Sequence, residues 1–190
     1  MPIDDKQFEA VREEVQRHLE DTEVSKLGHW DAARIYERVH RYYLGLPATL
    51  LSILLAWLIS SQTKTTLPTL GAGQALMVQI PVFLSLVVSL LSGLTAFLNL
   101  NETASRHRNA AENLNALWRD CRNWATDFPD ASHCEAAVKR VQLYRQRLNE
   151  INRDAPQIPR WAWKSVQKQR KEGSVSYTKK VDGLDLKKAN

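Results

Sequence analysis

Residues 44–60 read LGLPATLLSILLAWLIS, and residues 76–100 read LMVQIPVFLSLVVSLLSGLTAFLNL. No Asp, Glu, Lys or Arg occurs between Tyr42 and Thr63, or between Thr65 and Asn101. About 20 consecutive apolar residues span the hydrocarbon core of a bilayer as a helix. The two stretches therefore predict a transmembrane hairpin, with crossings at about 44–60 and 76–100 joined by a short loop.

The charged residues gather in the two flanks of this hairpin. Residues 1–43 carry 7 Lys and Arg against 10 Asp and Glu, whereas residues 102–190 carry 18 against 11. Opposite net charges favour docking of the flanks on each other, or contact of the basic flank with anionic lipid or an acidic partner. Nucleic-acid binding is not expected, because the basic residues are interspersed with acids as on a solvated helix face.

The charges nearest the crossings predict the orientation of the hairpin. Arg34, Arg38 and Arg41 precede the first crossing, and Arg106 and Arg108 follow the second. The connecting loop offers Lys64 alone. The positive-inside bias therefore predicts that both termini lie in the cytoplasm.

Apolar spacing predicts helices on both sides of the hairpin. Residues 1–24 are expected to form an amphipathic helix, with Phe8, Val11, Val15 and Leu19 on one face. A break is expected near Gly28, followed by a second helix that starts around Asp31 and enters the membrane. After the second crossing, one uninterrupted helix is expected to leave the membrane and end at about Thr126. Its heptad-like series is Gly93, Phe97, Leu100, Ala104, His107, Ala111, Leu114, Trp118, Cys121, Ala125 and Phe128.

This long helix is expected to fold back as an antiparallel hairpin over residues 102–153. A turn at 127–130 and a capping box from Ser132 to Glu135 would open the returning helix. A short helix follows from Arg160, and residues 166–190 are expected to form a basic, disordered tail. The predicted fold class is an all-α membrane protein with a two-helix transmembrane hairpin and a cytoplasmic helical bundle.

No signature of an enzyme occurs in the sequence. We find no glycine-rich phosphate loop, no nucleophile elbow and no histidine pair with metal-ligand spacing. The expectation is therefore a non-enzymatic chain without catalytic, cofactor-binding or metal-binding residues. Four residues flank the membrane on the predicted cytoplasmic side, namely His40, Arg41, His107 and Arg108. His40 and His107 can meet across the two helices, and packing with headgroup contact is favoured for them over a pH or metal role.

A stripe of small and polar residues runs along the second crossing, on another helix face than the heptad-like series. Its members are Ser85, Ser89, Ser92, Ala96 and Asn99, continued by Thr103 and Arg106. Such a stripe packs helices closely, or lines a water-filled path when several hairpins form a ring. Spacing alone favours packing.

Several short motifs carry a resemblance to a known family. They are His40-Arg41-Tyr42 with Gly45-Leu-Pro-Ala-Thr49, Phe97-Leu98-Asn99, Glu102 through His107-Arg108, Leu114 with Leu117, and Ala155-Pro-Gln-Ile-Pro159 with Trp161. In this order and spacing the chain resembles the SLATT family, two-helix membrane domains of bacterial nucleotide-signalling conflict systems. The resemblance covers roughly residues 25–165.

The resemblance implies an effector that oligomerises in the bacterial inner membrane and permeabilises it when a partner senses infection. The implied partners are membrane lipid, further copies of the chain and a separately encoded nucleotidyltransferase or sensor. It also moves the pore interpretation of the serine stripe ahead of simple packing. Phe97, or Glu102 with Arg106, would then form a cytoplasmic constriction. The competing hypothesis is a non-conducting membrane scaffold whose cytoplasmic helices recruit a partner.

Overall fold

The computed structural model describes residues 3–60 and 74–172, and these residues contain helices and no strand. They divide into two compact units. One unit comprises Met1–Ala33 and Ser105–Asn190; we call it the three-helix unit after the three helices that form its core. The hairpin unit comprises Arg34–Ala104. The predicted loop between the crossings and the end of the basic tail lie outside the described residues.

The first helix, α1 (Ile3–Arg38), is continuous, so the break predicted near Gly28 is wrong. Gly28 is buried, and a Cβ atom at this position would lie 3.1 Å from Cδ1 and 3.2 Å from Cγ2 of Ile158. The missing side chain of Gly28 therefore lets the segment that carries Ile158 approach α1 closely. The cost is a less stable helix interior, because glycine loses more conformational freedom on folding than other residues. The sequence pattern could not distinguish these two uses of glycine.

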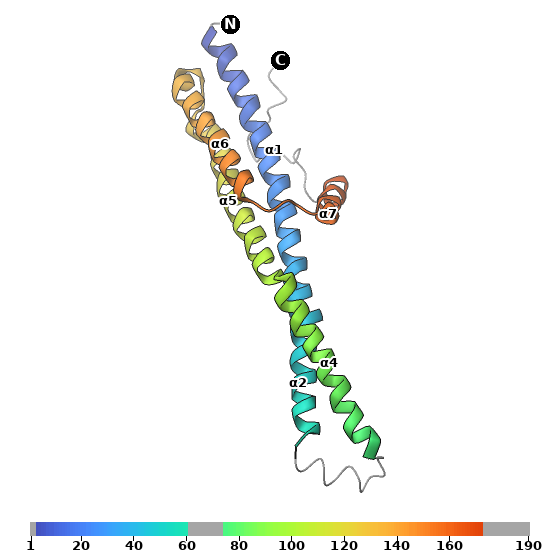
Figure 1. Ribbon diagram of the computed structural model, residues 1–190. Helices are drawn as coiled ribbons and strands as arrows, with labels where there is room; N and C mark the ends of the chain where they lie inside the picture. The colour runs from blue at the N-terminus through green and yellow to red at the C-terminus, as the bar shows by residue number, and fades with distance from the viewer. Residues whose placement is uncertain (1–2, 61–73, 173–190) are drawn as a thin grey trace. The chain divides into compact units, whose positions relative to one another are not determined.

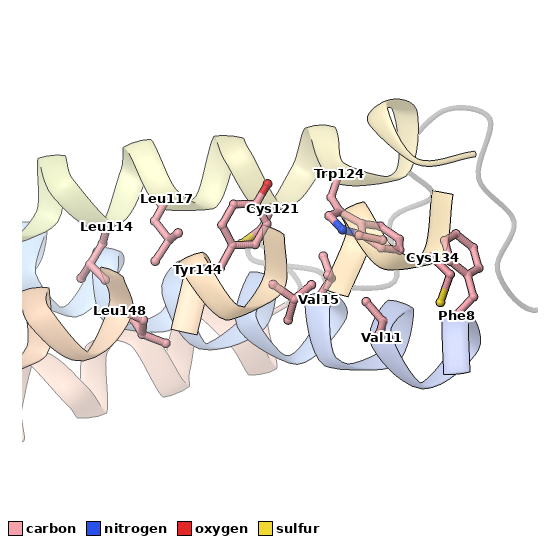
Figure 2. Packing of buried hydrophobic residues seen from close by; sticks show 12 residues of the cluster. Phe8, Val11, Val15, Leu114, Leu117, Cys121, Trp124, Cys134, Tyr144 and Leu148 are labelled. Carbon is pink, nitrogen blue, oxygen red and sulfur yellow. The ribbon is translucent and has the colours of Figure 1, made fainter. Parts of the chain in front are cut away.

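The core of the three-helix unit lies between α1, α5 (Leu100–Asp127) and α6 (Cys134–Asp154). Figure 2 shows side chains of α1 facing those of α5 and α6. The core side chains are Phe8, Val11, Val15, Leu114, Leu117, Cys121, Trp124, Cys134, Ala137, Val141, Tyr144 and Leu148. The Tyr144 hydroxyl donates to the Asp120 carbonyl over 2.9 Å, which ties α6 to α5. The predicted antiparallel pairing of the α5 and α6 segments is confirmed (Figure 1).

α5 buries two seams rather than one. Ala104, His107, Ala111, Leu114 and Cys121 of the predicted heptad series are buried. A parallel series one position earlier, Ala110, Leu117 and Trp124, is buried as well. A helix that contacts two neighbours needs an apolar stripe wider than the two positions of a coiled-coil seam. The spacing in the sequence predicts only one partner for α5, the returning helix α6.

The connection between α5 and α6 is capped differently from the prediction. A short 3₁₀ helix, η3 (Ala131–His133), precedes α6, and its N-cap is Asp130. The Asp130 carboxylate accepts a hydrogen bond from the Ser132 backbone N–H over 2.9 Å. The predicted capping box at Ser132 is therefore wrong, because the Ser132 hydroxyl bonds the Asp130 carboxylate and α6 begins only at Cys134.

The last described helix, α7 (Arg160–Lys171), packs on the same unit. Ala162 and Val166 are fully buried, and the Gln169 amide donates to the Asp31 carboxylate over 3.1 Å. The predicted tail boundary at residue 166 thus falls inside a packed helix.

The hairpin unit contains η1 (Val39–Gly45), α2 (Leu46–Leu58) and α4 (Gln74–Leu98). α2 and α4 contact each other as antiparallel neighbours (Figure 1). η1 is a π-helix, and the Leu46 N–H donates to the Arg41 carbonyl five residues earlier. Pro47, in the first turn of α2, supplies no N–H to the preceding turn. The wider turn of the π-helix accommodates this missing donor.

One residue interrupts the helix that was predicted to run from the second crossing to Thr126. Asn99, between α4 and α5, has a φ of 42°. Asn is one of the few L-residues that enter the left-handed region readily. Its carbonyl accepts the Thr103 N–H over 3.2 Å, and its side-chain amide donates to the Glu102 carboxylate. The prediction of an unbroken helix is wrong at this residue because Asn99 restarts the helix instead of continuing it.

Candidate functional site: the faces of the hairpin and a buried histidine pair

One face of each crossing helix packs against the other crossing. On α4 the partly buried residues Leu84, Val88, Leu91 and Thr95 follow helical spacing. On α2 the partly buried residues Ala48, Leu51, Leu55 and Leu58 follow the same kind of spacing. These two rows form the contact face of the hairpin, and they are built mainly from leucine and valine.

Most of the predicted serine stripe lies outside this contact face. Ser89, Ser92, Ala96 and Asn99 are exposed and Ser85 is partly exposed. Since each residue turns the helix by about 100°, the stripe lies roughly 100° from the contact face. The Ser85 hydroxyl donates to the Val82 carbonyl over 2.7 Å within the helix. Ser89, Ser92, Ala96 and Asn99 are therefore not used for packing within the hairpin, whereas Ser85 is partly buried like the residues of the contact face.

A second small-residue row, Thr49, Ser52 and Ala56, is exposed on α2. The Thr49 hydroxyl donates to the Gly45 carbonyl over 2.8 Å, and the Ser52 hydroxyl to the Ala48 carbonyl over 2.7 Å. Because these hydroxyl protons are bonded within the helix, the row presents small, largely satisfied side chains. Such rows let helix backbones approach closely in lipid.

The two small-residue rows lie on the same side of the hairpin. On both helices the residues of the row come one position after residues of the contact face. The row is therefore rotated from the contact face by about 100°, in the same sense on both helices when each is viewed from its N-terminus. Equal rotation on antiparallel neighbours places both rows on one side, which we call the small-residue face. The remaining outward positions of each helix, directly away from the partner or rotated in the opposite sense, carry bulky exposed side chains. They are Leu46, Leu50, Ile53, Leu54, Trp57, Phe83, Leu86, Leu90, Leu94 and Phe97.

The residues predicted as a cytoplasmic constriction fall at different places. Phe97 is 85% exposed and belongs to the bulky side of α4, not to the serine stripe. Glu102 accepts a hydrogen bond from Asn99 at the start of α5. Arg106 is exposed in the three-helix unit, where it lines a polar cavity of about 380 Å³ with Arg147 and other residues of α5 and α6. The structure brings Glu102 to the stripe residue Asn99, and the constriction remains a prediction.

The three-helix unit encloses a pair of histidines. The Nδ1 atoms of His29 and His107 lie 2.8 Å apart, and the side chains are 3% and 1% exposed. One ring donates its N–H and the other accepts, so at least one nitrogen of this contact is unprotonated. Burial, followed by the charge that His107 can carry, lowers the pKa of His29 to about 4. Burial also lowers the pKa of His107. Near neutral pH the pair is uncharged.

The remaining juxtamembrane residues have other surroundings. His40 lies in η1 of the hairpin unit. His107 contacts His29 within the three-helix unit, and the meeting of His40 with His107 stays a prediction. Arg41 is exposed and donates to the Glu37 carboxylate over 2.7 Å on its own helix. Arg108 is exposed.

Sequence reasoning missed His29, although a signal was present. The alternating three- and four-residue steps of Phe8, Val11 and Val15 continue through Thr22 to His29, and both of these polar residues are buried. The predicted break at Gly28 ended that series too early. His107, in contrast, stands in the predicted heptad seam of α5.

The arrangement offers no metal centre within the described residues, where no three His, Cys, Asp or Glu side chains group suitably. The thiols of Cys121 and Cys134 are free and buried in the core. Burial raises the pKa of Cys121 to about 12, which keeps it as an unreactive thiol.

The apolar segments define the class of protein. Asp5–Leu58 and Gln79–Asp127 each contain a window apolar enough to cross a membrane, and only 6% and 0% of these windows are buried. Because a core helix of a soluble protein would be mostly buried, the fold is that of an all-helical membrane protein with two crossings. The chain belongs to the family described as SMODS and SLOG-associating 2TM effector domain family 4, which it matches over residues 34–177. No curated protein and no solved structure matches it.

The family match has different limits from the resemblance seen in the sequence. It begins at Arg34, whereas the motifs indicated a start near residue 25. It continues beyond α7 to residue 177. His107 lies inside the match and His29 lies outside it. Membership in a two-crossing effector family makes this chain a membrane effector of that family's conflict systems.

Proposed function

We propose that this chain oligomerises in the bacterial inner membrane and forms a pore, or otherwise permeabilises the membrane, in antiviral defence. A separately encoded nucleotidyltransferase or sensor would activate it. Membership in the effector family supports the role of a membrane effector. The difference between the two sides of the hairpin supports the formation of a pore.

The small-residue face is the observation that carries the pore proposal. Packing within the hairpin uses the leucine and valine rows and leaves Ser89, Ser92 and Ser52 exposed. The opposite side is bulky and apolar, as expected for contact with lipid tails. A ring of hairpins that turn their bulky sides to lipid would turn hydroxyl-bearing sides to each other or to a central path. Opening that path would require the ring to widen at the stripe.

The proposed topology places both termini and the three-helix unit in the cytoplasm. Arg34, Arg38 and Arg41 precede the first crossing and Arg106 and Arg108 follow the second, which favours retention of both flanks inside. The chain would act without catalysis, cofactor or nucleic acid.

The test measures membrane potential and propidium entry in bacteria that express the full chain. Ser89→Leu with Ser92→Leu should abolish depolarisation, because the added bulk fills the small-residue face without preventing insertion. The matched control is Leu90→Phe with Leu94→Phe, which adds bulk at exposed positions on the opposite side of α4 and should leave depolarisation intact. Immunoblots of membrane fractions check that all forms accumulate equally.

Full depolarisation by the serine double variant would overturn the proposed pore face. If the unchanged chain leaves the potential intact, the assay is repeated with the genes that neighbour it. Depolarisation that appears only with those genes identifies a gated effector. An intact potential in both settings contradicts pore formation.

The competing function is a non-conducting scaffold, and the exposed basic side of α7 favours it. Arg160, Lys164, Lys168 and Lys171 lie on one exposed side of this helix, which suits recruitment of an acidic partner. Neutralising this side of α7 by Arg160→Gln, Lys164→Gln, Lys168→Gln and Lys171→Gln distinguishes the two functions. A scaffold that recruits through its basic end should lose function, whereas a pore former should retain its intrinsic activity.

A further inference from the structure

The outer side of α7 is a basic surface, which we call the α7 basic face. Arg160, Lys164, Lys168 and Lys171 follow steps of four, four and three residues, so they project on one side of the helix. All four side chains are exposed, and α7 itself contains no Asp or Glu. Lys168 lies 3.8 Å from Glu172 just beyond the helix, so four cations of the face stand against one neighbouring carboxylate.

Two tryptophans flank the α7 basic face. Trp161 is 41% exposed and Trp163 is 43% exposed, and they lie on either side of the buried Ala162. Tryptophan beside Lys and Arg is typical of helices that lie at the interface between lipid headgroups and acyl chains. The combination therefore suits a lipid surface better than it suits bulk water.

α7 is fixed at a particular end of the three-helix unit. Its Gln169 bonds Asp31, and Ile158, just before it, packs at Gly28. In the sequence these contacts on α1 lie near the first crossing. Tyr42 follows Asp31 by eleven residue steps, and even an extended chain of that length reaches only about 40 Å. Because the hairpin anchors the chain in the bilayer, α7 stays within reach of the membrane surface, which raises its effective concentration there.

We propose that the α7 basic face binds the anionic phospholipid headgroups of the bilayer that its own hairpin spans. The four cations supply the electrostatic attraction, and Trp161 and Trp163 supply contact with the headgroup layer. The occupant is the lipid surface because the membrane anchor makes that surface permanently available to α7. This contact would fix the three-helix unit against the membrane and is independent of whether the hairpin conducts.

The experiment uses the full chain reconstituted in vesicles with a nitroxide on Gln167→Cys. Gln167 lies on the side of α7 that carries Lys164 and Lys171, and its side chain is partly exposed. The buried native thiols should not compete for the label under native conditions. Collision of the nitroxide with a neutral nickel chelate reports exposure to water. The vesicles are phosphatidylcholine alone, or phosphatidylcholine with about one-third phosphatidylglycerol.

The expected result is a several-fold lower collision rate in the vesicles that contain phosphatidylglycerol. One Lys or Arg near an anionic surface strengthens binding roughly fivefold. Neutralising the face by Arg160→Gln, Lys164→Gln, Lys168→Gln and Lys171→Gln should therefore return the collision rate to its value in phosphatidylcholine. High salt should do the same, since the Debye length falls to about 3 Å at 1 M.

A matched control removes the same charge elsewhere. Lys6→Gln, Arg17→Gln, Lys139→Gln and Arg140→Gln change exposed residues of α1 and α6, and they should leave the protection unchanged. If the fourfold α7 variant does not fold, as judged by circular dichroism, the Lys164→Gln and Lys168→Gln double variant replaces it.

Equal collision rates in the two kinds of vesicle would overturn the proposal, as would protection that survives neutralisation of α7. Protection that disappears when the protein is diluted with excess lipid would also overturn it. That result would identify an acidic surface on a second copy as the occupant.

Discussion

The Nδ1 atoms of His29 and His107 lie 2.8 Å apart within the three-helix unit, joining α1 to α5. Both side chains are buried, and the interplanar angle of the two rings is 46°. Alanines are buried at neighbouring positions on both helices, namely Ala32, Ala33, Ala110 and Ala111. Small side chains at this level allow the two helices to approach closely enough for direct contact between the rings. The pair is thus a polar contact within an otherwise tightly packed layer.

Acid should destabilise the chain through this pair. The pKa of His29 is about 4 in the folded state, against an ordinary value of 6.5, so the unfolded state binds more protons between these values. The stabilisation is fully present above about pH 6.5 and is lost as the pH falls toward 4, on the order of 3 kcal/mol. Thermal unfolding of the full chain in detergent, followed by circular dichroism at pH 7.5 and 4.5, measures the loss.

The double variant His29→Leu with His107→Leu isolates the contribution of the pair from that of the carboxylates. It should lose less stability between the two pH values than the unchanged chain does. His133→Gln is the control, because His133 is exposed. An identical loss in the double variant and the unchanged chain would contradict the assignment.

Bulk at Gly28 should disturb the segment that leads into α7. Gly28→Val places its first side-chain carbon within 3.2 Å of two Ile158 atoms and adds two more carbons beyond it. Overpacking of this kind costs about 1–3 kcal/mol. The cost should appear as a lower unfolding temperature, and Ile158→Ala in the same chain should recover part of it. Ala10→Val, at an exposed position of the same helix, should show no comparable loss. Failure of Ile158→Ala to compensate would indicate another cause.

Asn99 should tolerate glycine better than alanine. Its φ of 42° lies in the left-handed region, where an L-residue with a Cβ atom pays roughly 1–2 kcal/mol. Asn99→Gly and Asn99→Ala both remove the side-chain bond to Glu102, so the difference between them isolates the backbone conformation. Thermal stability in detergent should rank glycine above alanine. Asn101→Ala, in the regular part of α5, should be neutral; an alanine variant at 99 as stable as the glycine variant would argue against the left-handed turn.

The core of the three-helix unit should be sensitive at Leu117 and insensitive at Leu143. Leu117 is 0% exposed between α5 and its neighbours, whereas Leu143 on α6 is 57% exposed. Leu117→Ala should cost about 2–5 kcal/mol through lost burial and an unfilled cavity. Leu143→Ala removes the same atoms and should cost below about 0.5 kcal/mol. Denaturant titration followed by the fluorescence of the tryptophans, including buried Trp124, measures both. Equal costs would contradict the assigned burial.

Local sequence pattern predicted the regular parts of this molecule well. The charge-free stretches predicted the two crossings, and the spacing from Ala104 to Cys121 predicted the buried seam of α5. Single residues with two structural uses were predicted less well. Gly28 was interpreted as a helix break and instead admits Ile158, and Asn99 was placed inside a helix that it interrupts. In both cases the outcome depends on a neighbour or on a backbone conformation that spacing does not encode.

In the candidate site, too, local pattern predicted some features and missed those that depend on neighbouring helices. The serine stripe of α4 was found from its spacing, because helical periodicity fixes which residues share a face. Its exposure could not be found in that way, since it depends on which face α2 covers. The pairing of His107 with His29 likewise required the register between α1 and α5.

The sequence by itself determined that this chain has two apolar crossings flanked by amphipathic helices, because bilayer thickness and helical periodicity act on neighbouring residues along the chain. Tertiary structure alone decided that leucine and valine rows close the hairpin, that the small residues share one side of it, and that two histidines meet inside the three-helix unit. These features arise from the relative rotation and register of helices that are distant in sequence. Side-chain packing sets both quantities, and no local pattern contains them.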